Sequence, residues 1–196
     1  MTETEAIKLL KEIGALLEGH FVLSSGLHSG AYVQIATLMQ YPQQAEKFCR
    51  GLADNMIQAG CPKPDVVIGP ALGAITVGYE LARQFGAKAY FAEREGDGFA
   101  LRRGFRLNPG DKVIIAENTT TTGGSAQKVV ALAQSLGADV LGVATLADRT
   151  AGKSVLTVPL YSLVKFSFNE YTKEDCPLCK QGLPIIKPGS SPGKAS

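Results

Sequence analysis

The chain has 196 residues, of which 45% are hydrophobic and 19% charged, and a formal net charge of +2 at pH 7. This length suits one domain, and the composition is that of a globular protein. The small charge argues against a nucleic-acid-binding surface, no apolar run approaches the ~20 residues of a membrane span, and the acidic N-terminus is unlike a signal peptide. Four cysteines without an export signal favour a reducing compartment, so we expect a cytoplasmic protein that binds neither nucleic acid nor membrane.

The N-terminal part is predicted to form a helix and a hairpin. Apolar residues on one face predict an amphipathic helix from Thr4 to Glu18, ended by Gly19. Two short β segments, residues 20–23 and 31–35, flank a Ser/Gly-rich loop and predict a hairpin. His20 and His28 stand alone in the sequence, and we interpret both as structural or solvated residues.

Strands and helices then alternate. Pro42 begins a predicted helix that runs to about Ala59. Beyond it we expect strands at residues 65–69, 88–92, 113–116, 140–147 and 160–166, helices at 74–85 and 126–136, a charged loop at 93–98, a β-ribbon at 101–107 and a turn at 108–111. This order predicts an α/β fold with a mostly parallel sheet flanked by helices, and ligands bind beyond the carboxyl ends of such strands. The tail from Lys187 is predicted to be disordered.

The most informative stretch is Val113–Ser125. Four apolar residues of a buried strand are followed by Glu117 and Asn118, four threonines, two glycines and Ser125, and then by a helix. A strand, a tight loop and a helix N-terminus form an anion site, because the free backbone N–H groups and the helix dipole favour negative charge. The sequence therefore predicts a phosphate site, with a carboxylate placed to meet the ribose that carries the phosphate.

This stretch resembles the signature by which type I phosphoribosyltransferases bind phosphoribosyl diphosphate (PRPP). One position departs from the family pattern, since Asn118 stands where the family has an acidic residue. The resemblance covers about residues 5–188 and is greatest to the orotate phosphoribosyltransferases. It implies the type I phosphoribosyltransferase fold with a small N-terminal hood, and it divides the chain into a helix and hood (1–40), an α/β core (41–170) and a C-terminal segment (171–196).

The resemblance also implies the site residues. PRPP-binding residues are expected in three segments and one arginine: Glu117, Asn118, Thr119, Thr120, Thr121, Thr122, Gly123, Gly124 and Ser125; Pro70, Ala71, Leu72 and Gly73, which match the diphosphate loop; and Arg94. Glu117, Asn118 and Arg94 are the expected catalytic residues, with Arg102 and Arg103 as alternatives to Arg94 in a short lid. Orotate is expected to contact Thr121, Arg149, Ser25 and Gly26.

The implied activity is transfer of the phosphoribosyl group from PRPP to orotate, giving orotidine monophosphate and diphosphate in pyrimidine biosynthesis. The implied partners are these small molecules and a second copy of the chain, in a homodimer. Mg²⁺ is the implied cofactor, held mainly by PRPP, with Glu117 as the possible protein ligand. Two alternatives stay open: a phosphoribosyltransferase for another base, such as a purine, and a PRPP-sensing regulatory protein without catalytic activity.

One motif lies outside this scheme. Cys176 and Cys179 form a lone C-x-x-C pair, which supplies only two zinc ligands, while Cys49 and Cys61 lie far off without a motif. We therefore expect free thiols, and the sequence leaves metal binding by this pair open.

Overall fold

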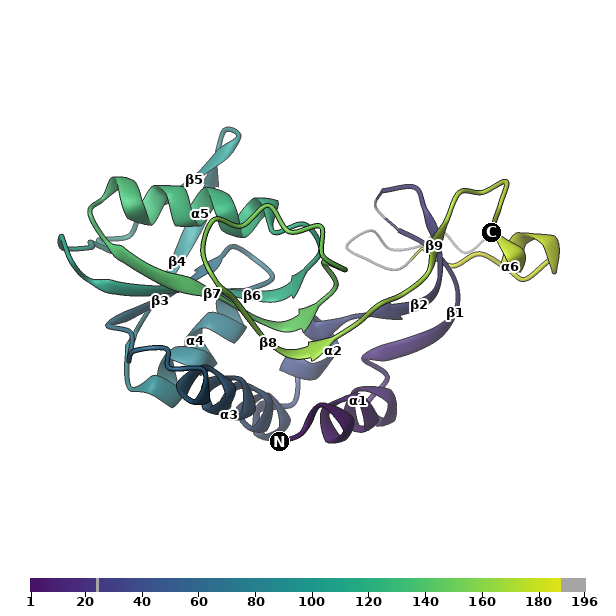
Figure 1. Ribbon diagram of the computed structural model, residues 1–196, viewed down its shortest axis with the longest axis horizontal. Helices are drawn as coiled ribbons and strands as arrows, with labels where there is room; N and C mark the ends of the chain where they lie inside the picture. The colour runs from purple at the N-terminus through teal and green to yellow at the C-terminus, as the bar shows by residue number, and fades with distance from the viewer. Residues whose placement is uncertain (24, 188–196) are drawn as a thin grey trace.

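The computed structural model describes residues 1–23 and 25–187. Its larger sheet has six strands: β3 (Val66–Pro70), β4 (Lys88–Glu95), β5 (Gly98–Leu101), β6 (Lys112–Thr120), β7 (Asp139–Asp148) and β8 (Leu160–Lys165). The strand order is β5-β4-β3-β6-β7-β8, and every pair is parallel except β4–β5 at the edge (Figure 1). The predicted mostly parallel sheet is therefore confirmed.

Helices cover both faces of this sheet. Helix α5 (Gly124–Ser135) lies on one face, and α3 (Pro42–Gln58) and α4 (Ile75–Phe85) lie on the other (Figure 1). Each face has its own apolar core, because the central strands β3 and β6 are buried on both sides and send alternate side chains to each. The α/β class and the helices predicted at 42–59, 74–85 and 126–136 are confirmed, to within two residues at each boundary.

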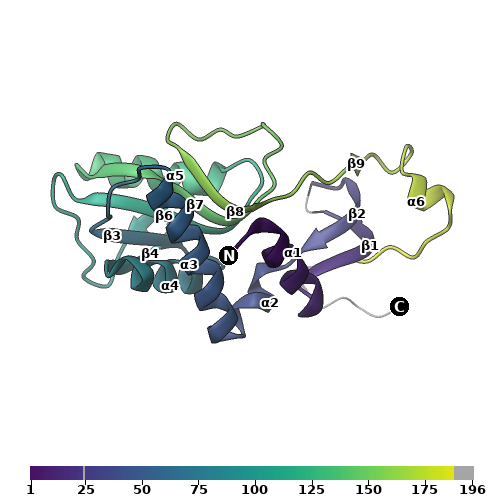
Figure 2. The same cartoon turned by 60° about the horizontal axis from the view of Figure 1, so that its bottom comes forward.

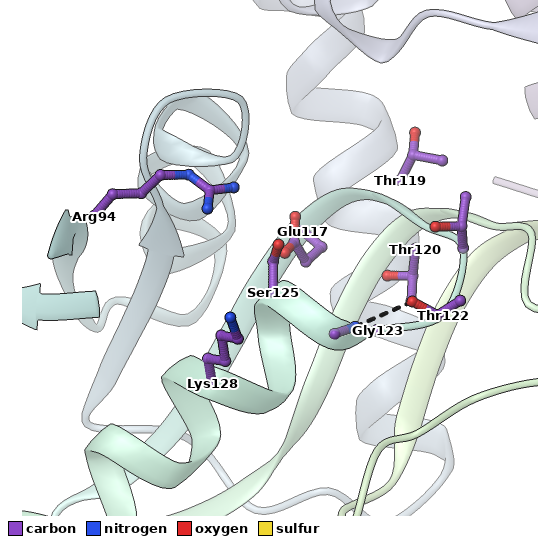
Figure 3. A pocket seen from close by; sticks show the side chains of 10 residues that line it. Arg94, Glu117, Thr119, Thr120, Thr122, Gly123, Ser125 and Lys128 are labelled. Atoms are coloured by element: carbon purple, nitrogen blue, oxygen red, sulfur yellow. Dashed lines mark hydrogen bonds between the residues drawn. The ribbon is translucent and has the colours of Figure 1, made fainter. Parts of the chain in front are cut away.

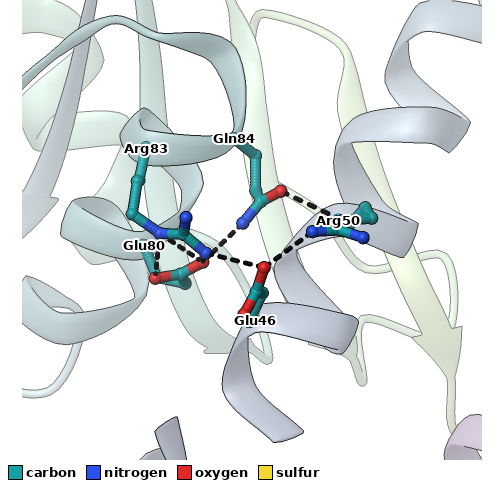
Figure 4. Close-up of polar contacts among 5 residues, drawn as sticks. All are labelled: Glu46, Arg50, Glu80, Arg83 and Gln84. Atoms are coloured by element: carbon teal, nitrogen blue, oxygen red, sulfur yellow. Dashed lines mark hydrogen bonds and ion pairs between the residues drawn. The ribbon is translucent and has the colours of Figure 1, made fainter. Parts of the chain in front are cut away.

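An ion-pair network joins α3 to α4 at the surface (Figure 4). Glu46 of α3 accepts from Arg50 at 2.6 Å and from Arg83 of α4 at 3.0 Å, and Arg83 also contacts Glu80 at 2.8 Å. The two arginines are at least half exposed, whereas Glu46 and Glu80 are partly buried. Salt therefore screens much of the network, and the apolar contacts beneath it supply most of the packing energy.

The N-terminal part forms a separate small sheet, hereafter the hood. Its strands are β1 (Leu16–Val22), β2 (His28–Val33) and β9 (Glu170–Tyr171), with β2 in the middle and all pairs antiparallel (Figure 2). Helix α1 (Glu3–Glu12) contacts β1 and β8, and α6 (Pro177–Lys180) follows β9, whereas α2 (Ile35–Met39) follows β2 and packs against α3 and β6. The predicted hairpin is confirmed, although His28, expected in the loop, begins the second strand.

The predicted helix Thr4–Glu18 is wrong in its second half. Helix α1 has its capping box at Thr2 and Glu5 and ends at Glu12, and Gly14 follows with a left-handed φ of +69°. Leu16 and Leu17 then pair with Val33 and Tyr32 of β2. The spacing of these apolar residues fits a helix as well as a strand, and their pairing with β2 makes them part of a strand.

The charged segment after residue 92 also differs from its prediction. Residues 93–95 continue β4, and β5 returns antiparallel with Glu95 opposite Gly98, so the expected loop is a tight hairpin. The ribbon predicted at 101–107 is absent from the described chain, because β5 ends at Leu101. The turn at 108–111 is confirmed by the bond from the Asp111 N–H to the Asn108 carbonyl.

The carboxyl ends of β3, β4, β6 and β7 meet at one edge of the large sheet. Pro70 lies beside Ala92, and Thr120 lies beside Asp148. The loops after these strands are thereby brought together. In the described ranges, no helix combines the length and the apolar character that crossing a membrane requires. The tail predicted to be disordered falls, beyond Lys187, outside the described residues.

Candidate active site

A pocket of about 390 Å³ opens at this edge of the sheet (Figure 3). It is lined by the end of β6, the loop that follows it, the first turns of α5 and one arginine of β4; the residues are Arg94, Glu117, Thr119, Thr120, Thr121, Thr122, Gly123, Gly124, Ser125 and Lys128. We call it the phosphate pocket. Eight of these residues come from the segment 117–125, in which Asn118 alone does not line the pocket, so the sequence predicted most of the lining.

The loop is shaped for a small anion. Gly123, the N-cap of α5, has a left-handed φ of +83°, and a Cβ there would lie 2.8 Å from Leu156, so only glycine fits. The first α5 N–H groups lack carbonyl partners within the helix, and that of Gly124 donates to the Thr122 hydroxyl at 3.4 Å. Backbone donors, hydroxyls and the positive end of a twelve-residue helix thus converge on the pocket.

Thr120 carries an unpaired hydroxyl. It lies in β6 with 2% of its surface exposed, and among the described residues its Oγ1 is the buried side-chain polar atom without a hydrogen-bond partner. A buried hydroxyl without a partner costs free energy, and such groups concentrate where a ligand supplies the missing bond. Thr120 lines the phosphate pocket, so this donor fits an anion bound there.

Glu117 is the carboxylate of this lining. Burial raises its pKa from the usual 4.5 to about 7, against the lowering effects of a backbone hydrogen bond from Asn118 and of the Arg94 charge. The Arg94 side chain extends from β4 toward it (Figure 3). Burial disfavours the ionised form of Glu117. A ligand with a positive charge or with hydroxyl groups would stabilise that form, because it would place an opposite charge or hydrogen-bond donors against the carboxylate.

Asn118 links β6 to the loop after β3. Its Oδ1 accepts a bond from the Thr119 N–H at 2.6 Å, and a Cβ at Gly73 would lie 3.0 Å from its Nδ2. The segment Pro70–Gly73 therefore lies beside the phosphate pocket without lining it, and Leu72 in it is exposed. The peptide bond between Ala71 and Leu72 is cis.

Two cations line the pocket, and the sequence analysis named only one of them. Lys128 lies one turn into α5 from Ser125, and its ammonium also donates to the carbonyl of Asp97 at the tip of the β4–β5 hairpin. The helical spacing of Ser125 and Lys128 was the signal that could have found it. Arg102 and Arg103, the alternatives to Arg94, instead pair with Glu95 and Glu93 at 2.6 and 2.8 Å.

The residues expected to contact orotate are dispersed. Thr121 lines the phosphate pocket, whereas Ser25 and Gly26 lie in the hood loop between β1 and β2. Arg149 follows β7, and its backbone N–H donates to the carbonyl of Thr120 at 2.8 Å. Its guanidinium lies over the ring of Phe168 and contacts Glu170 of β9 at 3.1 Å. Arg149 thus lies between the phosphate loop and the hood.

A mostly parallel sheet whose carboxyl edge carries a hydroxyl-rich loop at a helix N-terminus and one carboxylate is typical of α/β proteins that bind sugar phosphates. The comparisons with known proteins agree. The model of the phosphoribosyl transferase domain matches residues 39–174, and the chain belongs to this family.

Its relatives point in one direction. The chain is 46% identical over 190 residues to an orotate phosphoribosyltransferase of Caldanaerobacter subterraneus, covering 97% of this chain and 98% of the relative. It is 50% identical over 183 residues to that of Carboxydothermus hydrogenoformans, covering 93% and 95%. The crystal structure of orotate phosphoribosyltransferase from Aeropyrum pernix superposes with a TM-score of 0.71 at 27% identity, over 81% of this chain and 92% of that one.

Proposed function

We propose that this chain is an orotate phosphoribosyltransferase, which transfers the phosphoribosyl group of PRPP to orotate in pyrimidine biosynthesis. The observation that carries the proposal is the phosphate pocket, where Glu117 lies beside a hydroxyl-lined loop at a helix N-terminus. The choice of orotate rests on the relatives of that name, which match the chain over almost its whole length.

Different residues of the phosphate pocket bind different parts of PRPP. Residues 121–125 and the N-terminus of α5 bind the 5′-phosphate through backbone N–H groups and hydroxyls, and Thr120 adds its unpaired hydroxyl. Glu117 accepts hydrogen bonds from the ribose hydroxyls. The Thr119 N–H donates to the Asn118 Oδ1, which orients the Asn118 side chain at the end of β6. The sugar is thereby fixed at both its phosphate and its ring.

The diphosphate is assigned to the opposite side. Arg94 and Lys128 supply positive charge, and the loop Pro70–Gly73 supplies backbone donors next to Asn118. Glu117 and the threonine hydroxyls are oxygen donors of the kind Mg²⁺ prefers, and within the described lining Glu117 is the one carboxylate. These residues fit a magnesium ion held mainly by PRPP; when bound, it neutralises charge on the diphosphate.

The reaction needs no protein nucleophile. The bond between the anomeric carbon and the diphosphate oxygen breaks with its electron pair on the oxygen, the orotate ring nitrogen bonds to that carbon, and the proton of that nitrogen passes to the departing diphosphate or to solvent. The sugar turns cationic in between, so a carboxylate beneath the ribose stabilises the transition state more than the ground state. Most of the rate enhancement then comes from alignment and from fixed charges, because the two reactants are held in line.

Orotate recognition is assigned to Arg149, Thr121, Ser25 and Gly26. A guanidinium binds a carboxylate through two parallel hydrogen bonds, so Arg149 takes the orotate carboxylate. Its present partner Glu170 belongs to β9 of the hood, and orotate would share Arg149 with it. We further propose that residues 1–40 close over the base, that residues 41–170 form the catalytic core with 171–196 as a C-terminal segment, and that the enzyme is a cytoplasmic homodimer.

The proposal is tested by substrate consumption. The full chain is incubated with PRPP and Mg²⁺ and, in parallel, orotate, uracil, adenine or hypoxanthine, and loss of each base is followed by absorbance. We expect rapid loss of orotate alone. Loss of a purine instead would assign another base, and tight PRPP binding without loss of any base would favour a regulatory protein.

A further inference from the structure

The hood contains a cluster of four potential metal ligands that the phosphate pocket does not use. His20 of β1, His28 of β2, Cys176 and Cys179 bring one ligand atom each to within 4.8 Å of one another. Three of these residues are buried, and Cys179 is partly exposed. We propose that they bind one zinc ion, which fastens the C-terminal segment to the hood.

The separations of the ligand atoms suit tetrahedral zinc. Cys179 Sγ lies 3.3 Å from His28 Nδ1 and 3.6 Å from His20 Nε2, and Cys176 Sγ lies 3.5 Å from His20 Nε2. Zinc at about 2.0 Å from nitrogen and about 2.3 Å from sulfur places its ligands roughly 3.3–3.8 Å apart. The two imidazole nitrogens, 2.8 Å apart, need to separate by only about 0.5 Å to match that geometry.

The fold fixes how the histidines face the cluster. In the β1–β2 ladder Val22 lies opposite His28, and the register shifts between Glu18 and Phe21, where His20 lies. His20 Nε2 there comes to 2.8 Å from His28 Nδ1. His20 Nδ1 lies 2.9 Å from the carbonyl of Leu183. A carbonyl only accepts, so Nδ1 carries the proton and Nε2 turns a lone pair toward the cysteines. An outer hydrogen bond of this kind is the usual support of a zinc-bound histidine.

Within residues 171–187, few other contacts hold the C-terminal segment. Leu183, Ile185 and Ile186 are about half exposed, and α6 has only four residues. Backbone bonds tie Ile186 to His20 and Val22, and β9 pairs with only two residues of β2. Small sheets with so little apolar burial are commonly stabilised by a metal or a disulfide. Zinc supplies this link, and its binding releases the thiol protons.

This inference is independent of the substrate and is tested on metal content. The full chain, purified under reducing conditions after growth with zinc, is analysed by mass spectrometry for bound metals. The variant Cys179→Ser removes one ligand, and Cys61→Ser is the matched control, a buried cysteine outside the cluster. We expect about one zinc per chain in the wild type and in Cys61→Ser, and at least a tenfold loss in Cys179→Ser.

A second measurement keeps the test decisive if Cys179→Ser does not fold. Zinc is removed from the wild type, and Co²⁺ is added. We expect absorption bands of tetrahedral Co²⁺ together with thiolate-to-cobalt charge-transfer bands, and saturation of both at one equivalent of Co²⁺ per chain. Wild-type protein with far less than one zinc and no such bands, or with a Cys176–Cys179 disulfide when isolated under reducing conditions, would overturn the proposal.

Discussion

The phosphate pocket and the hood cluster are built in opposite ways. Residues 117–125 of the pocket follow one another along a strand, a loop and a helix start, and the backbone provides much of the chemistry. The hood cluster takes side chains from positions as far apart as 159 residues, and the backbone only aims them. A change in the pocket should therefore alter catalysis and leave metal content unchanged, whereas a change in the cluster should do the reverse.

The largest expected effect in the pocket comes from Glu117→Gln. The amide keeps the shape and loses the charge that faces the ribose. Charge-assisted bonds contribute about 1.5–3 kcal/mol, so we expect kcat/KM to fall about 100-fold with metal content unchanged. Steady-state kinetics measure this change in kcat/KM. The control variant is Glu95→Gln, which removes an exposed carboxylate of the β4–β5 hairpin. A decrease in kcat/KM of less than about threefold would show that the Glu117 charge does not stabilise the transition state.

Arg149→Gln should act on one substrate only. It removes the guanidinium assigned to the orotate carboxylate, so kcat/KM for orotate should fall about 30-fold while the KM for PRPP stays within about twofold. Arg103→Gln, an arginine paired with Glu93 on the hairpin, is the control. If the kinetic constants for orotate and for PRPP worsened equally, Arg149 would stabilise the fold through its ion pair with Glu170 rather than bind orotate.

Asn118→Asp should raise activity. It restores a negative charge beneath a cationic sugar, and the carboxylate can still accept the bond from the Thr119 N–H. We expect kcat/KM to rise at least about 10-fold, equivalent to about 1.4 kcal/mol. An unchanged or lower value would show that the asparagine amide is adapted to its contact with the Gly73 loop.

The pH dependence follows from Glu117. Its folded-state pKa is raised, to about 7, so its contribution to stability is complete below pH 4.5 and is lost as pH rises through about 7. Activity has the opposite sign, because the carboxylate is the active form. We expect kcat/KM for PRPP to fall about tenfold per pH unit below about 7, and this dependence to vanish in Glu117→Gln. If kcat/KM of the Glu117→Gln variant still fell with decreasing pH, the pH dependence would belong to another titrating group.

Thr120→Val should have the smallest effect. Valine has nearly the same shape and removes a buried hydroxyl that lacks a partner. The free energy of unfolding should stay the same or rise by up to about 1 kcal/mol, while the KM for PRPP rises about threefold. Denaturant titration and kinetics measure the two quantities. A loss of stability with an unchanged KM would make the hydroxyl structural.

The same contrast explains what the sequence could predict. Val113–Ser125 carries a buried strand, a glycine turn and a helix start in one window, so local rules predict both the element order and a phosphate site. Lys128 was not predicted, because it lies outside the loop motif, within α5, and only the fold brings it beside the β4–β5 hairpin. His20 and His28 were interpreted as structural or solvated, and both are buried, so they are not solvated. They also do not stand alone, because the β1–β2 pairing brings them together and the C-terminal segment adds Cys176 and Cys179.

Errors in the fold have a similar origin. Leu16 and Leu17 fit a helical stripe, and only their pairing with β2 turns them into a strand. The charged residues 93–95 were expected in a loop, but antiparallel pairing with β5 extends β4 through them. Pairing partners distant in sequence decided both cases, and a local pattern carries no information on such partners.

The central claim is that the end of β6 binds the sugar phosphate of PRPP. A crystal structure of the chain with PRPP and Mg²⁺ tests it most directly. We predict the 5′-phosphate at residues 121–125, the ribose hydroxyls on Glu117 and the diphosphate toward Arg94 and Lys128. Density for PRPP at another place on the molecule, with this pocket empty, would contradict the claim.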